Sequence, residues 1–131
     1  LHVVTQPGFL ADRGDDYARD VDAADLPHLY PYASLLAAGV DVLPSSDAPY
    51  GPLDPWAVMR AAAHRTLVPS ERVPAATVLE GYLRDGELRP RAIRSGCAAD
   101  LVLLHLPLAE ALREPDHSVV RATWIGGRPL R

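Results

Sequence analysis

The chain has 131 residues, of which 48% are hydrophobic, and a formal net charge of −4. Its length and apolar content suit a single packed domain, while its negative charge and the lack of an apolar run of roughly 20 residues exclude a basic nucleic-acid binder and a membrane-spanning chain. One cysteine, Cys97, excludes an internal disulfide framework and a multi-cysteine zinc cage. We therefore expect a cytoplasmic protein without nucleic-acid or membrane partners.

The basic residues of the chain are all arginine, and lysine is absent. The absence of lysine excludes a Schiff base, a phosphate-binding loop lysine and a lysine general base. The chain begins with Leu1 instead of methionine, and on this ground we expect a fragment or a processed chain.

The first predicted element is a β-strand at residues 1–5, which ends at Gln6-Pro7-Gly8. Residues 11–25 contain six aspartates among small side chains, a composition that predicts a long, exposed, acidic loop. Cation binding is the alternative for this segment, but its spacing does not match that of an EF-hand loop, which needs alternating ligands, a central glycine and a final glutamate. We favour the solvated loop.

The middle of the chain shows alternating signals for helices and strands. A helix is predicted at residues 31–39, where apolar side chains share one face and Gly39 ends the element. A short strand follows at residues 40–43, and then a polar, proline-rich loop at residues 44–52. This succession is typical of an α/β fold.

Two more helices are predicted after this loop. Asp54 followed by Pro55 provides an N-cap and a proline in the first turn, which together are a strong helix start. The next helix begins near Pro74 and ends at Asp85-Gly86. The side chains expected to face the core are Trp56, Met59, Ala63 and Leu67 in the first helix and Val78, Leu79, Tyr82 and Leu83 in the second.

The last third of the chain predicts β-structure. Residues 100–106 are an almost continuous apolar run, short enough for a buried strand. Residues 119–125 alternate in part and are followed by Gly126-Gly127, a two-residue loop typical of a β-hairpin. The predicted fold class is therefore α/β, passing into a small β module near Arg89-Pro90-Arg91.

Asp47 is the strongest candidate for chemistry because it lies just past the strand at residues 40–43, where functional groups of α/β sheets gather. A carboxylate there can bind a metal ion, accept a proton from water or accept a phosphoryl group. The last role requires a lysine, as in receiver domains, and this chain has none. The alternative is structural, because an aspartate before small residues and proline often forms an Asx-turn.

Other reactive side chains form no catalytic motif. No two of the five histidines have the spacing of a local metal clamp. His105 is expected in the core or at the edge of its strand. His64 is expected on a helix, either facing solvent or supporting the groups of a site from outside. Ser45 and Ser46 lack the glycine-flanked elbow of a nucleophilic serine. Cys97 has no adjacent histidine, so we interpret its thiol as buried or incidental.

The loop that carries Asp47 resembles a segment of the amidohydrolases. The residues that carry the likeness are Ser45-Ser46-Asp47-Ala48-Pro49, Leu53-Asp54-Pro55-Trp56 and Ala61-Ala62-Ala63-His64-Arg65. Residues 3–10 and 29–40 resemble a strand end and a helix of amidohydrolase family 3, and residues 95–104 and 120–128 resemble strands of its β-sandwich. The branch that the chain resembles is the N-substituted formamide deformylase-like group, and the likeness spans nearly the whole chain.

This resemblance implies a metal-dependent hydrolase with a (β/α)8 TIM-type barrel and a composite β-sandwich. In that family the acid after the last barrel strand contacts the metal and is the general base for the hydrolytic water, and only Asp47 matches it here. The implied cofactor is a divalent metal ion, zinc. Its remaining ligands in the family are an HxH pair, a carboxylated lysine or acid, and two later histidines, and their motifs are absent from this chain. Tyr50 is expected in the vicinity of the substrate.

The resemblance predicts an incomplete barrel. Residues 1–89 would form the C-terminal portion of the barrel, with its last strands and helices, and residues 90–131 strands of the β-sandwich. A complete barrel needs roughly 200–250 residues, more than this chain has. We expect a C-terminal fragment of an amidohydrolase that hydrolyses amide or other non-peptide C–N bonds of a small-molecule substrate. This segment alone is expected to be inactive, and the protein is expected to form a homo-oligomer.

Two other interpretations stay open. The chain could be a catalytically inactive remnant that serves as a structural or interaction module, or a small α/β binding domain that folds alone. An HxH motif encoded upstream of Leu1 would favour the enzyme over the remnant.

Overall fold

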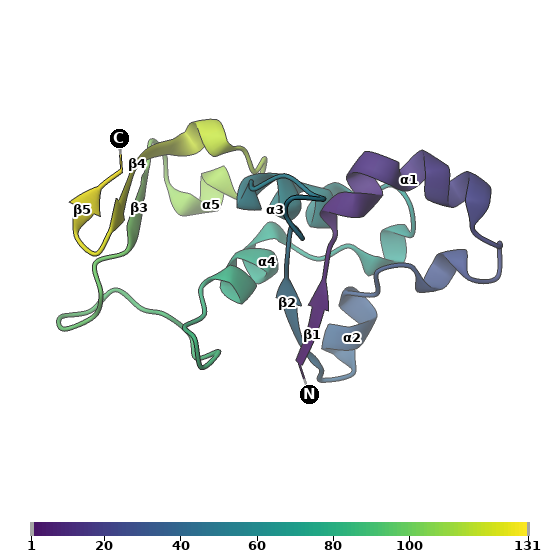
Figure 1. Cartoon of the computed structure of the whole chain (residues 1–131), viewed down its shortest axis with the longest axis horizontal. Coiled ribbons are helices and arrows are strands. Elements are labelled where there is room, and N and C mark those ends of the chain that lie inside the picture. Colours follow the sequence, from purple (N-terminus) through teal and green to yellow (C-terminus); the bar gives the residue numbers. More distant parts are fainter. Residues whose placement is uncertain (1, 131) are drawn as a thin grey trace.

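A computed structural model describes residues 2–130 of the chain (Figure 1). Strands and helices alternate in its first part, and a second, antiparallel sheet follows. The strands are β1 (His2–Thr5), β2 (Asp41–Pro44), β3 (Leu101–Leu104), β4 (Val120–Ile125) and β5 (Arg128–Pro129). The helices are α1 (Gly8–Asp20), α2 (Ala33–Ala37), α3 (Pro55–His64), α4 (Ala75–Tyr82) and α5 (Leu108–Ala111), with short 3-10 turns at Leu26–His28, Pro69–Glu71 and His117–Val119.

β1 and β2 lie side by side as a parallel pair, with His2 opposite Asp41 and Thr5 opposite Pro44 (Figure 1). The pairing continues past the strands, because the Ser45 amide donates to the Thr5 carbonyl at 2.9 Å. Parallel strands need a long connection, which α1 and α2 supply here. Both strands therefore end at the same edge of the sheet, which we call the carboxyl edge.

The strands predicted at residues 1–5 and 40–43 and the mixed α/β class are confirmed. Leu1 and Arg131, which the predicted ranges include, lie outside the described residues. Within residues 2–130, β1 and β2 form one sheet and β3, β4 and β5 form another, and neither closes into a barrel. No helix in this part of the chain is long and apolar enough to cross a membrane. The division of the chain at residues 89–90 stays a prediction.

The core lies where α3 and α4 pack against each other and α4 packs against β2. Val58, Met59 and Val78 are almost completely buried there. Helix α4 approaches β2 so closely that a side chain at Gly81 would collide with the ring of Pro44. Glycine is therefore required at this crossing.

The predicted start of α3 is confirmed. Asp54 caps the helix, and its Oδ1 accepts a hydrogen bond from the Trp56 amide at 2.9 Å. Trp56 and Met59 are buried as expected, and Val78 is buried in α4. Leu83 is different: α4 ends one residue earlier, and Leu83 is 47% exposed, so its expected place in the core was wrong.

Residues 11–25 are largely helical, and the prediction of a loop was wrong. α1 covers Gly8–Asp20 and is kinked at Arg13, where the backbone is non-helical (φ −129°, ψ 17°). One side of α1 contacts α3 and buries Leu10, while the aspartates of the segment stay exposed. Packing of a single apolar side thus outweighs the weak helix propensity of aspartate and glycine.

The C-terminal part contains the predicted hairpin. β4 and β5 pair antiparallel, with Ile125 opposite Arg128. The turn between them places Gly126 and Gly127 at positive φ (56° and 76°), the backbone region that glycine enters at low cost. The hairpin prediction is confirmed.

β3 forms where a strand was predicted, but the expectation that it is buried was wrong. Leu101, Val102 and Leu103 are 37%, 56% and 44% exposed. β3 is an edge strand in the order β3-β4-β5, and its last residue, Leu104, is partly buried against the core. His105, which was expected in the core or at the edge of its strand, is exposed directly after the edge strand β3, and its amide donates to the Val119 carbonyl at 2.8 Å.

Replacing Tyr32 with phenylalanine is expected to leave the free energy of unfolding unchanged or to raise it by up to about 1 kcal/mol. Tyr32 is 1% exposed, and within the described residues its hydroxyl has no hydrogen-bond partner. Burial raises the pKa of Tyr32 to about 12, so the hydroxyl stays protonated. Urea unfolding measures the difference, and a loss of more than 1 kcal/mol would contradict the absence of a partner.

Candidate functional site

Asp47 lies at the carboxyl edge, in the loop that follows β2. Its backbone is left-handed (φ 53°), and its carbonyl accepts a hydrogen bond from the Tyr50 amide at 2.9 Å. The Asp47 amide donates to the Ser45 hydroxyl oxygen at 3.0 Å. The hydroxyl of Ser45, and not the Asp47 carboxylate, therefore supports the turn. The carboxylate is exposed, and among the described residues it makes no hydrogen bond.

Tyr50 follows in the same loop and is 73% exposed. Its amide is tied to the Asp47 carbonyl, so its backbone position depends on the same turn. Gly51 follows Tyr50 in this turn. A side chain at this position would collide with the carbonyl oxygen of Ser46, so the turn requires glycine here. The loop thus presents Asp47 and Tyr50 together on an exposed surface at the carboxyl edge.

An aromatic cluster of Phe9, Tyr17 and Tyr30 lies next to the loop that carries Asp47. Phe9, the second residue of α1, lies 3.4 Å from the position of a Cβ at Gly51. The ring of Tyr30 meets Phe9 edge to face, with centroids 6.2 Å apart, and its hydroxyl hydrogen-bonds that of Tyr17 at 2.9 Å. Sequence reasoning missed this cluster because it treated residues 11–25 as a loop. The signal available was the spacing of Leu10 and Tyr17, which are two helical turns apart.

The charges around Tyr30 link this cluster to Asp47. Burial raises the pKa of Tyr30 to about 12, and the hydrogen bond to Tyr17 adds to the rise. The negative charge of Asp47 raises the pKa further, while the positive charge of Arg13 lowers it. Asp47 and Arg13 therefore both act on the same phenol, which stays protonated at neutral pH.

Two buried charged residues hold the segment that carries Tyr30. Arg65 donates to the carbonyls of Tyr30 and Leu29, at 2.9 Å each. The Oε2 atom of Glu71 accepts hydrogen bonds from the amides of Tyr32 (2.7 Å) and Ser34 (3.0 Å). The backbone from residue 29 to residue 34 is therefore clamped at both of its ends.

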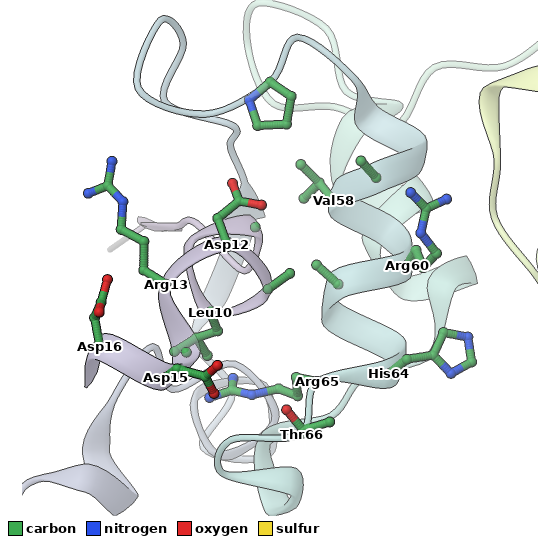
Figure 2. Close-up of a pocket in the computed structure, with 16 residues that line it drawn as sticks. Leu10, Asp12, Arg13, Asp15, Asp16, Val58, Arg60, His64, Arg65 and Thr66 are labelled. Atoms are coloured by element: carbon green, nitrogen blue, oxygen red, sulfur yellow. The ribbon is translucent and has the colours of Figure 1, made fainter. Parts of the chain in front are cut away.

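A pocket of about 590 Å³ opens between α1 and α3, and Asp47 is not part of its wall (Figure 2). Asp12 points into it from α1. Arg60 and His64 project from the side of α3 that faces away from α1. Arg60 donates to the carbonyl of Pro115 at 2.6 Å, and His64 is exposed, as predicted. Pro52, at the end of the loop that carries Asp47, lines this pocket, whereas Asp47 itself does not.

The model of the amidohydrolase family matches residues 3–131. The chain belongs to the amidohydrolase family. A comparison with curated proteins gives no match. Family membership confirms the amidohydrolase resemblance of the sequence and supports hydrolase activity in general. The formamide deformylase-like branch and the C-terminal position within a longer enzyme stay predictions.

Amidohydrolases of this family are generally metal-dependent, and a metal site needs several His, Cys, Asp or Glu side chains close together. Among residues 2–130, no three His, Cys, Asp or Glu side chains come together to hold a metal ion. His2 lies at the other end of β1 and bonds to Asp41 through its Nδ1 at 3.0 Å. Asp47 provides one carboxylate, whereas a catalytic metal site uses about three protein ligands. The described residues of this amidohydrolase therefore do not form a metal site by themselves.

Proposed function

We propose that this chain is the C-terminal part of a metal-dependent amidohydrolase that hydrolyses amide or other non-peptide C–N bonds of a small-molecule substrate. In this proposal, the enzyme belongs to the N-substituted formamide deformylase-like branch, and Asp47 is its general base. The observation that carries the proposal is the free, exposed carboxylate of Asp47 at the carboxyl edge of two parallel strands in an amidohydrolase.

Hydrolysis of a C–N bond requires that water lose a proton while it adds to the carbonyl carbon, and that the leaving nitrogen gain a proton. Asp47 can accept the first proton because among the described residues its carboxylate makes no hydrogen bond that would occupy it. The same carboxyl group can then donate that proton to the leaving nitrogen. Tyr50 lies in the vicinity of the substrate in this proposal, since its exposed side chain follows Asp47 in the loop.

The metal ion of the proposed enzyme is zinc, and Asp47 is the one ligand that this chain contributes. Its other ligands belong to residues beyond those described, because no cluster of three donors exists within residues 2–130. In this proposal β1 and β2, with α1 to α4, are the last units of a TIM-type barrel, and β3 to β5 are strands of a β-sandwich. The exposed apolar side chains of β3 support this assignment, because they indicate a surface that other elements cover.

Replacing Asp47 with asparagine is expected to lower the turnover of the full-length enzyme at least 100-fold, by roughly the contribution of a general base. The amide keeps the size of the side chain but does not accept a proton. The measurement is the release of formate from an N-formyl amino acid, with circular dichroism to verify folding. Glu114→Gln is the matched control, because Glu114 is exposed after α5 and its change should leave turnover as it is. Unchanged turnover in Asp47→Asn would contradict the proposal and favour the inactive module.

A further inference from the structure

The backbone of Asp47 is held in a conformation that most residues avoid. Its φ of 53° lies in the left-handed region, which non-glycine residues enter at an energetic cost. Its carbonyl accepts hydrogen bonds from the amides of Tyr50 (2.9 Å) and Gly51 (3.3 Å), and its amide donates to the Oγ atom of Ser45 at 3.0 Å. These three hydrogen bonds fix the backbone from which the carboxylate projects.

Ser45 is the residue that ties this backbone to the sheet. Its own amide donates to the carbonyl of Thr5 at 2.9 Å and so extends the pairing of β1 and β2 by one residue. Thr5 is 4% exposed, which places this anchor in the interior. Tyr50 and Gly51, in contrast, belong to the loop itself. Among the hydrogen bonds that the described residues make to Asp47, only the one to Ser45 therefore joins it to the parallel strands.

The position of the Asp47 carboxylate matters for its proposed role. A general base must lie within hydrogen-bond reach of the proton that it accepts, and a misplacement of about 1 Å can lower a rate on the order of 100-fold. The carboxylate is exposed and makes no hydrogen bond among the described residues, so no contact of its own holds it. Its place relative to the sheet is determined through the backbone, and the link from backbone to sheet is the hydroxyl of Ser45.

We propose that Ser45 is a positioning residue of the proposed reaction, and that its hydroxyl holds Asp47 where the carboxylate can accept the proton of the hydrolytic water. This inference rests on the proposed function of Asp47 and adds the residue that orients the base. Ser45 acts through the amide of Asp47 and does not itself contact the substrate. Its contribution therefore belongs to the chemical step and not to the binding of the amide substrate.

Replacing Ser45 with alanine removes the acceptor of the Asp47 amide. In the full-length enzyme, with N-formylphenylalanine as the probe, we expect kcat to fall about 10- to 100-fold and KM to change less than about twofold. Ser45→Thr keeps the hydroxyl and should restore kcat to within about threefold of the wild type. Ser95→Ala is the matched control, because Ser95 is exposed in the segment before β3, and it should leave both constants as they are.

The hydrogen bond can also be followed without turnover. A hydrogen-bonded amide exchanges its proton with solvent more slowly than a free one, so exchange at the Asp47 amide should be about 5- to 10-fold faster in Ser45→Ala than in the wild type or in Ser45→Thr. Hydrogen exchange of the full-length protein, resolved to this amide by NMR or mass spectrometry, measures the difference. Equal exchange in Ser45→Ala and the wild type would overturn the inference.

A double-mutant cycle separates this inference from the proposed function. If Ser45 acts through Asp47, Ser45→Ala should lower the residual kcat of Asp47→Asn by less than about twofold, because the base is already absent. A full additional loss would show that Ser45 acts by another route or on the fold. An unchanged kcat in Ser45→Ala alone would overturn the inference while the role of Asp47 stands. Turnover that survives Asp47→Asn contradicts the proposed function itself, and the inference with it.

Discussion

Replacing Arg65 with methionine is expected to lower the free energy of unfolding by about 3–5 kcal/mol. Arg65 is 4% exposed, and besides the carbonyls of Tyr30 and Leu29 it donates to that of Leu67 at 3.0 Å. Methionine fills part of the same space but donates no hydrogen bond. The substitution therefore leaves three carbonyls without their donor and removes a positive charge near the buried carboxylate of Glu71.

Urea unfolding at neutral pH measures this loss. Arg113→Met is the matched control, because Arg113 is exposed after α5, and its replacement should change the free energy of unfolding by no more than about 0.5 kcal/mol. Arg65→Lys should also be destabilising, since an ammonium group cannot reach three separate carbonyls as a guanidinium does. A loss below 1 kcal/mol in Arg65→Met would show that the clamp on residues 29–34 is not important for the fold.

Replacing Glu71 with glutamine is expected to lower the free energy of unfolding by about 2 kcal/mol at neutral pH, because the amides of Tyr32 and Ser34 lose a charged acceptor. Burial alone would raise the pKa of Glu71. The hydrogen bonds from the amide and hydroxyl of Ser34 and the amide of Tyr32 outweigh burial and hold this pKa below its usual range. The carboxylate therefore stabilises the folded state in its ionised form.

The sign of the pH dependence follows from this lowered pKa. The contribution of the Glu71 carboxylate to the free energy of unfolding is fully present above the pKa of an unfolded glutamate, about 4.3. This contribution is lost as the pH falls through the lower pKa that Glu71 has in the folded state. The stability difference between the wild type and Glu71→Gln should thus shrink below about pH 4. Urea unfolding between pH 7 and pH 3 tests this, with the exposed Glu80→Gln as control. A difference that stays constant over this range would show that Glu71 is not ionised in the folded protein.

The elements that could be predicted from the sequence have local signals. Asp54 and Pro55 determine the start of α3 through the N-cap bond and the fixed φ of proline. Gly126 and Gly127 determine the hairpin because the turn needs positive φ at both positions. For α1 the local signal is weak, the spacing of Leu10 and Tyr17 alone, because this helix is stabilised mainly by the burial of Leu10 against a helix that is distant in sequence.

The site shows the same division between local and distant determinants. Asp47 could be located because it follows a strand, and such positions meet at one edge of a sheet. The clamp of Arg65 and Glu71 could not, because its hydrogen bonds join residues that are 35 to 39 positions apart. Charged residues are rarely buried, and only the folded chain shows which carbonyls and amides compensate them.

The central claim is that this chain contributes one essential carboxylate, Asp47, to a metal-dependent site that other residues complete. Its most direct test compares the isolated 131-residue chain with the full-length protein encoded by the same gene. Zinc content is measured by mass spectrometry and turnover by formate release from N-formylphenylalanine. We predict stoichiometric divalent metal and turnover in the full-length protein, and neither in the isolated chain. Stoichiometric zinc and turnover in the isolated chain would contradict the claim.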